Sequence, residues 1–248
     1  MDQVAKSKPD GYTIGLGQTS NLAISPTLYA GLPYNPVKDF VPIGAVADAP
    51  LVVVVASNSP YKTLADVVTA AKAKPNTLTL ATSGNGTVAH LTGELFQKAA
   101  GIKLQHVPYN GASQAIVDLL GRSINVFISS VPTTLSQIKV GSMRVLAVTS
   151  SERAAVLPNV PTINESGYKG FDARTWFGMV APAGTPPAIV AELNAEINKV
   201  LAMPEIRKKI TVEGGNVMGG TPEQFSALIK TEIPRWGKVV KDSGARID

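Results

Sequence analysis

Hydrophobic and polar residues alternate with two different periods along most of the chain. Short apolar or alternating runs that end at Gly, Pro or Asn predict strands, and runs with apolar residues three and four apart predict helices. The predicted strands are 12–17, 43–46, 50–56, 77–82, 103–107, 125–128, 144–149 and 176–181. The predicted helices are 22–29, 63–74, 87–100, 112–120, 133–140, 185–201, 205–210 and 221–240. Regular alternation of strands and helices indicates an α/β fold with mostly parallel sheets.

The stretch 77–95 is the most informative part of this pattern. It reads as an alternating strand, a turn of small polar residues and a helix with Val88, Leu91 and Leu95 on one face. Thr87 is a suitable helix N-cap, and Gly and Asn in the turn accept positive φ angles at little cost. Free N–H groups and the positive dipole at a helix N-terminus attract anions. The turn is therefore predicted to hold a carboxylate or a similar anion, although an ordinary strand–helix turn explains the pattern equally well.

Composition narrows the classes of function. The 248 residues carry a net charge of +5, are 44% hydrophobic and include no cysteine. Disulfides, thiolate nucleophiles and cysteine metal sites are therefore excluded. The basic residues are scattered and aromatic residues are scarce, so nucleic-acid binding is not expected. The two histidines, His90 and His106, have no partner at metal-ligand spacing, and no cofactor motif is present.

No catalytic motif stands out either. Ser83 is not flanked by the Gly-x-Ser-x-Gly pattern of a nucleophile elbow, and the glycines around Asn85 lack the Gly-Lys-Ser/Thr ending of a phosphate loop. Asp118 is expected to be a surface or capping residue. The histidines are interpreted as hydrogen-bonded structural residues, and a hydrolase that uses His90 near Ser83 is kept as a less favoured alternative.

A series of short motifs, taken together, resembles one family of proteins. The motifs are, in chain order, 81–87 (ATSGNGT), 90–91 (HL), 107–112 (VPYNGA), 118–121 (DLLG), 146–150 (LAVTS), 157–162 (LPNVPT), 176–178 (WFG), 181–186 (APAGTP) and 219–225 (GGTPEQF). This succession resembles the Bug/TctC family, the extracytoplasmic solute receptors of tripartite tricarboxylate transporters. The resemblance covers essentially the whole chain.

The resemblance implies a two-lobed periplasmic binding protein (type II) fold. Lobe 1 would comprise residues 1–56 and 176–248, and lobe 2 residues 57–175. The lobes would close over a small organic carboxylate and present it to membrane transporter subunits, in the periplasm. Receptors of this kind are not enzymes and need no cofactor or metal.

The resemblance also implies a set of ligand-binding residues. They are Thr19, Ser20, Ser83, Gly84, Asn85, Gly86, Thr87 and Ser129. Members of the family that bind amino acids tend to have an aspartate at the position of Ser129, where a carboxylate pairs with the ligand ammonium. A hydroxyl cannot supply that charge, so acids without an ammonium group are expected to be preferred here.

Family members normally begin with an export signal, a first strand and a Pro-Gly-Gly turn, which are missing from this sequence. The absent strand would be central in lobe 1, so lobe 1 is expected to be rearranged, loosened or involved in self-association, and ligand affinity to be lower than in a longer relative. A self-associating module without transport function is the second alternative.

Overall fold

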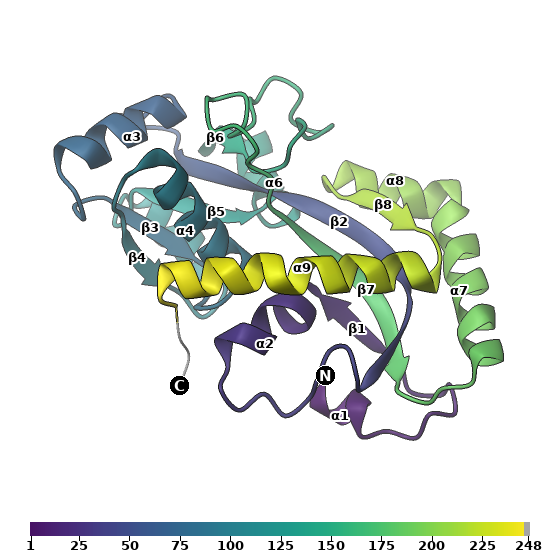
Figure 1. Ribbon diagram of the computed structural model, residues 1–248. Coiled ribbons are helices and arrows are strands. Elements are labelled where there is room, and N and C mark those ends of the chain that lie inside the picture. The colour runs from purple at the N-terminus through teal and green to yellow at the C-terminus, as the bar shows by residue number, and fades with distance from the viewer. Residues whose placement is uncertain (246–248) are drawn as a thin grey trace. The chain divides into compact units, whose positions relative to one another are not determined.

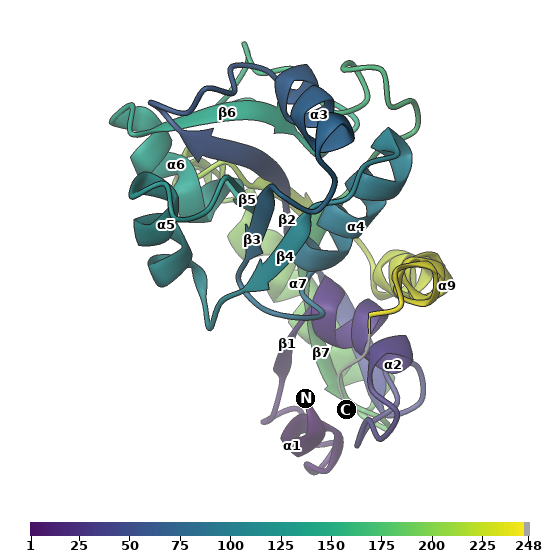
Figure 2. The ribbon, with the colours of Figure 1, turned by 90° about the vertical axis from the view of Figure 1, so that its left-hand side faces the viewer.

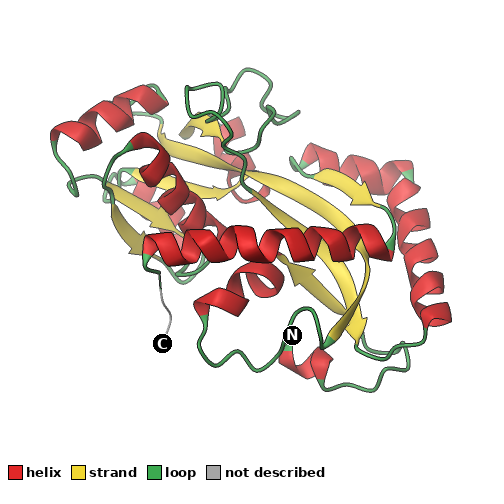
Figure 3. Cartoon of the chain, viewed as in Figure 1, coloured by secondary structure: helices red, strands yellow, loops and turns green. Residues whose placement is uncertain are grey.

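In the computed structural model, residues 1–245 are described, and the chain divides into two compact units. Unit 1 comprises residues 1–48 and 175–248, of which 246–248 lie outside the described residues, and unit 2 comprises residues 49–174. Each unit combines a sheet with helices, as Figure 3 shows by colour. The mixture of strands and helices in both units confirms the predicted α/β class.

Unit 1 contains the first and last elements of the chain. They are α1 (Asp2–Ala5), β1 (Gly15–Gln18), the π-helix η1 (Ser20–Ile24), α2 (Ser25–Leu28), the first half of β2 (Phe40–Ala56), most of β7 (Arg174–Pro182), α7 (Pro187–Ala202), α8 (Pro204–Val212), β8 (Asn216–Gly219) and α9 (Pro222–Ser243). β1 pairs antiparallel with β7, and β8 pairs antiparallel with the 45–48 segment of β2.

The core of unit 1 lies beneath α9, which runs alongside η1 and α2 (Figure 1). Phe225, Ile229 and Trp236 form its buried face. A close approach explains the glycine at 237, because a Cβ there would come within 2.8 Å of the Thr27 hydroxyl. The buried Glu232 accepts hydrogen bonds from the indole N–H groups of Trp236 at 2.8 Å and Trp176 at 3.3 Å, so this buried carboxylate is not left unpaired.

Unit 2 is built around the second half of β2. Its other elements are α3 (Leu64–Ala73), β3 (Thr79–Thr82), α4 (Val88–Ala100), β4 (Gln105–Pro108), α5 (Ala112–Leu120), β5 (Val126–Ser130), α6 (Val131–Lys139) and β6 (Met143–Val148). β3 lies between β4 and β5 and is parallel to both, whereas β2 pairs antiparallel with β5 and β6. In Figure 2, α4 lies on one side of β3 and β4, and α5 and α6 lie on the other.

The strand pairing corrects the prediction of mostly parallel sheets. The parallel pairings join β3, β4 and β5, and the other pairings with a described register are antiparallel. The predicted strands 43–46 and 50–56 form the single 17-residue strand β2. Pro42 and Pro50 do not interrupt it, since proline accepts an extended conformation where no ladder donor is needed.

Three predicted helix starts are confirmed and others are corrected. Thr63 and Thr221 form capping boxes with Asp66 and Gln224, and Thr87 caps α4. The helix predicted to begin at Thr185 instead begins at Pro187, and the Thr185 hydroxyl donates to the Pro182 carbonyl.

The region 18–21, predicted as a turn, is also helical from position 19. The Asn21 side chain accepts the Gln18 N–H at 2.8 Å, so the chain passes directly from β1 into η1. Pro26 lies in the first turn of α2, where its missing N–H does no harm. The short helix predicted over 22–29 is therefore two joined helical segments.

Thr149 joins three backbone segments of unit 2. Its fully buried hydroxyl accepts the Leu51 N–H at 2.9 Å and lies 2.7 Å from the Ala173 carbonyl, to which it donates.

The substitution Thr149→Val keeps the shape of the side chain but leaves the Leu51 N–H unpaired. We expect a loss of about 1–3 kcal/mol in the free energy of unfolding, measured by chemical denaturation. Thr69→Val, on the exposed face of α3, is the matched control, and equal effects of both substitutions would contradict this role.

Candidate functional site in unit 2

The carboxyl ends of three neighbouring strands meet at one edge of the unit 2 sheet. In the parallel register Thr82 lies opposite Pro108 on β4, and Ala81 lies opposite Phe127 on β5. α4, α5 and α6 begin within a few residues of these strand ends. Three helix N-termini therefore lie at the same edge (Figure 2). Such edges are where α/β proteins bind ligands, and N-terminal N–H groups favour anions.

The 83–87 turn between β3 and α4 has a backbone that requires glycine. Gly84 has φ +138° and Gly86 has φ +68°, which L side chains rarely adopt. The Thr87 hydroxyl donates to the Gly84 carbonyl at 2.9 Å and accepts the His90 N–H at 3.3 Å. Its hydroxyl proton is thus used inside the turn, so Thr87 shapes the turn and its backbone N–H remains for a ligand.

Two histidines support the turn from the α4 side of the sheet. The buried Gly86 N–H donates to Nδ1 of His90 at 3.1 Å. The ring of His90 stacks on that of His106, with centroids 4.0 Å apart and planes 4° from parallel. His106 Nε2 lies 2.7 Å from the Thr82 hydroxyl. Burial, with a smaller contribution from the neighbouring His106, lowers the pKa of His90 to about 4, and burial lowers the pKa of His106. Both rings are therefore neutral at pH 7.

The remaining polar groups of the turn are available for a ligand. The hydroxyls of Ser83 and Ser129 donate to no other described residue, and Asn85 is exposed. Ser129 is only 3% exposed. It lies near the end of β5, which extends beyond the predicted strand 125–128, and it is two residues beyond Phe127, the partner of Ala81. At the start of α4, the N–H groups of Val88 and Ala89 have no intrahelical acceptor.

The predicted residues Thr19 and Ser20 belong to unit 1. Thr19 is fully buried and its hydroxyl accepts the Trp176 N–H at 2.8 Å, so it ties η1 to β7. Ser20 is the first residue of η1 and is partly exposed. Ligand binding by Thr19 and Ser20 stays a prediction. The candidate site consists of residues of unit 2 alone.

A second polar group lies beside the turn on α5. The Tyr109 hydroxyl donates to Asp118 at 2.7 Å, and the Gln114 side chain donates to the other carboxylate oxygen at 2.9 Å. Burial and the hydrogen bond to Asp118 raise the pKa of Tyr109 to about 12. Asp118 is therefore a partly buried acceptor that fixes Tyr109, rather than the capping or surface residue that was predicted.

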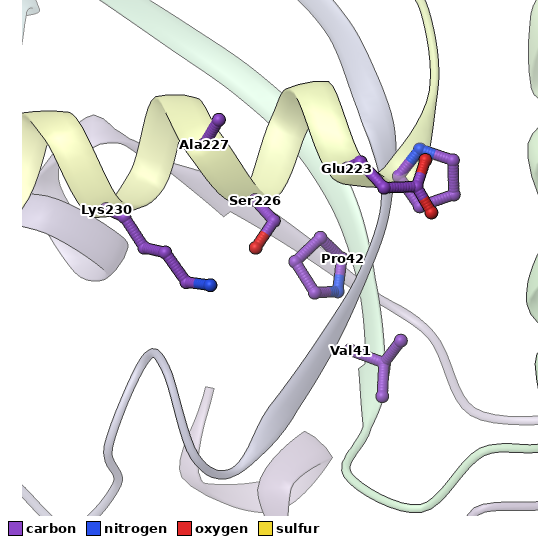
Figure 4. Close-up of a pocket in the computed structure, with 7 residues that line it drawn as sticks. Val41, Pro42, Glu223, Ser226, Ala227 and Lys230 are labelled. Atoms are coloured by element: carbon purple, nitrogen blue, oxygen red, sulfur yellow. The ribbon is translucent and has the colours of Figure 1, made fainter.

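Unit 1 has a surface pocket of about 390 Å³ on another set of residues (Figure 4). Val41, Pro42, Pro222 and Ala227 give it an apolar lining, and Glu223, Ser226 and Lys230 are its polar residues. None of the predicted ligand-binding residues lines this pocket, so it is not the predicted site.

Among the described residues, the groups at this edge of the sheet can bind a ligand, but they do not form a serine–histidine pair. His90 uses Nδ1 to accept the Gly86 N–H, and within residues 1–245 the Ser83 hydroxyl has no histidine partner. Over the same residues there is no cluster of three or more His, Asp or Glu that could hold a metal ion, and no helix is long and apolar enough to cross a membrane.

Comparisons with known proteins identify relatives that match almost the whole chain. Protein BugT of Bordetella pertussis is 38% identical over 247 residues, covering 99% of this chain and 76% of its own length. The solved structure "R. palustris Rpa4515 with adipate" has a TM-score of 0.92 and 32% identity, covering 99% of this chain and 83% of that one. The solved structure of MatC (Rpa3494) from Rhodopseudomonas palustris, "with bound malate", has a TM-score of 0.86 and 28% identity, covering 96% of this chain and 82% of that one.

The match to a protein family extends over nearly the whole chain. Residues 1–245 match the family described as "Tripartite tricarboxylate transporter family receptor". Together with the relatives above, this match confirms the resemblance found in the sequence motifs. The chain belongs to the tripartite tricarboxylate transporter receptor (TctC/Bug) family.

Proposed function

We propose that the protein is a periplasmic receptor that binds a small organic carboxylate and delivers it to a tripartite tricarboxylate-type membrane transporter. The observation that carries the proposal is the 83–87 turn, which places unpaired N–H and hydroxyl donors at the start of α4. Two similar structures are described with adipate and with malate, both dicarboxylates. The transporter partner and the periplasmic location rest on membership of the family.

The chemistry of the turn suits a carboxylate. Each carboxylate oxygen accepts two hydrogen bonds, and bonds to a charged acceptor are stronger than those between neutral groups. The turn supplies the hydroxyl of Ser83, and the start of α4 supplies the N–H groups of Val88 and Ala89. The α4 dipole adds a favourable field for negative charge. No charged side chain belongs to the 83–87 turn, so recognition there depends on neutral donors.

Ser129 bears on the class of acid. Because it is buried next to the turn and its hydroxyl is unpaired, it can donate to a ligand oxygen. It has no charge to offset the desolvation of a ligand ammonium group. The proposed ligands are therefore acids without an α-ammonium group. Neither the hydrolase nor the self-associating module is favoured by an observation in the described residues.

A panel of mono- and dicarboxylates that includes adipate and malate tests the proposal. In a thermal-shift assay, a true ligand at 100 times its Kd adds about 2.7 kcal/mol to stability. Ser83→Ala should weaken binding of that acid by about 1–2 kcal/mol in calorimetry, because a hydrogen bond to a charged group is lost. Ser123→Ala, in an exposed position near the start of β5, is the control. A panel in which no acid stabilises the protein would contradict the proposal.

The preference against an ammonium group is a separate prediction. Succinate should bind the wild-type protein more tightly than aspartate, which differs from it by the ammonium group. Ser129→Asp should reduce or reverse the preference for succinate over aspartate. The new carboxylate pairs with the ammonium group of aspartate and repels succinate, which lacks that group. Calorimetry with both ligands and both proteins measures the ratio. Tighter binding of aspartate than of succinate to the wild type would show that the inference from Ser129 is wrong.

A further inference from the structure

His90 and His106 reach the ligand-binding turn without being among the groups proposed to touch the ligand. We infer that the two stacked imidazoles are positioning residues, which hold the 83–87 turn in the conformation that accepts a carboxylate. This inference rests on the proposed function for its effect on binding. Its effect on the ligand-free turn can be tested independently.

His90 acts on the turn through Gly86. The Gly86 N–H is buried and its acceptor is Nδ1 of His90, at 3.1 Å. Because this N–H is turned inward to the histidine, the φ of +68° at Gly86 is fixed together with the direction of the following Thr87 N–H. Without an acceptor on His90, a buried donor would be left unpaired, and the turn would rearrange to solvate it.

His106 acts on the turn through Thr82. The Thr82 hydroxyl lies 2.7 Å from Nε2 of His106 and 3.3 Å from the Gly84 carbonyl. This relay is complete when His106 Nε2–H donates to Thr82 and Thr82 donates to Gly84. The Gly84 carbonyl also accepts from Thr87 at 2.9 Å. The two histidines thus hold the two glycines of the turn. His106 acts through Thr82 on the Gly84 carbonyl, and His90 accepts the Gly86 N–H.

The hydrogen bond from Gly86 requires a neutral His90. A proton on Nδ1 would replace the acceptor by a second donor and break the contact. The titratable or charged groups around His90 are Glu94 on α4, whose carboxylate is 4.0 Å from Nε2, the stacked His106 on β4, and Lys103, whose charge acts on Glu94. Burial keeps His90 neutral until the pH falls towards 4. Protonation of His90 at about pH 4 and below should therefore break the hydrogen bond from Gly86 and release the turn.

Two substitutions at His90 separate positioning from simple packing. Asparagine places Oδ1 near the position of Nδ1 and can still accept the Gly86 N–H, whereas leucine fills the space without an acceptor. We expect His90→Leu to weaken binding of adipate by about tenfold, and His90→Asn to recover most of that loss. Gln97→Leu is the matched control. It also removes a buried acceptor from α4, that of the Leu104 N–H at 2.7 Å, but away from the turn.

Ligand-free protein gives a readout that does not depend on binding. The Gly86 amide should exchange slowly with solvent in the wild type and in His90→Asn, and quickly in His90→Leu, in hydrogen-exchange NMR. A receptor that binds none of the tested acids would overturn the proposed function while this pattern still supported the positioning role. Equal Gly86 protection in the asparagine and leucine variants would overturn the positioning role, even if the protein binds adipate.

The pH dependence supplies a second readout. The ratio of wild-type to His90→Asn affinity cancels the titration of the ligand itself. This ratio should be constant between pH 7 and 5.5 and fall about twofold by pH 4, where half of His90 is protonated and only the neutral fraction is competent to bind. A ratio that stays constant down to pH 4, or a Gln97→Leu protein that loses as much affinity as His90→Leu, would contradict the inference.

Discussion

An α-helix cannot hydrogen-bond its own first N–H groups, and this constraint organises unit 2. Because β3, β4 and β5 run parallel, their carboxyl ends and the first turns of α4, α5 and α6 meet at one edge of the sheet. At α4 only the third N–H, that of His90, is satisfied by the Thr87 cap. The N–H groups before it need an outside acceptor, and a carboxylate is well suited to that position.

Holding these donors in place costs conformational freedom, because the two glycines of the turn are flexible in isolation. The protein offsets this cost with side chains that act on the glycine backbone. Thr82 and Thr87 fix the Gly84 carbonyl, and His90 fixes the Gly86 N–H. The buried, neutral imidazoles add rigidity without placing a positive charge beneath the site. Binding would then need little further ordering, which favours affinity for a small ligand.

Local sequence patterns predicted most elements because capping and turn residues act over a few positions. Thr63, Thr87 and Thr221 begin helices as predicted, and Gly101 ends α4 in the left-handed conformation. Long-range pairing was not predictable in the same way. The continuity of β2 through two prolines depends on partners far along the chain, and so do the antiparallel ladders. The stacking of His90 on His106 joins a helix and a strand, so spacing alone gave no signal for it.

The central claim, that the start of α4 binds the ligand carboxylate, is tested most directly by amide NMR during titration with the acid that stabilises the protein most. The account predicts saturable downfield shifts of the Thr87, Val88 and Ala89 amide protons, since each gains a charged acceptor, with a smaller shift at the Gly86 amide, which is already bonded to His90. Saturable binding that leaves the amides of the 83–87 turn and the first turn of α4 unchanged would contradict it.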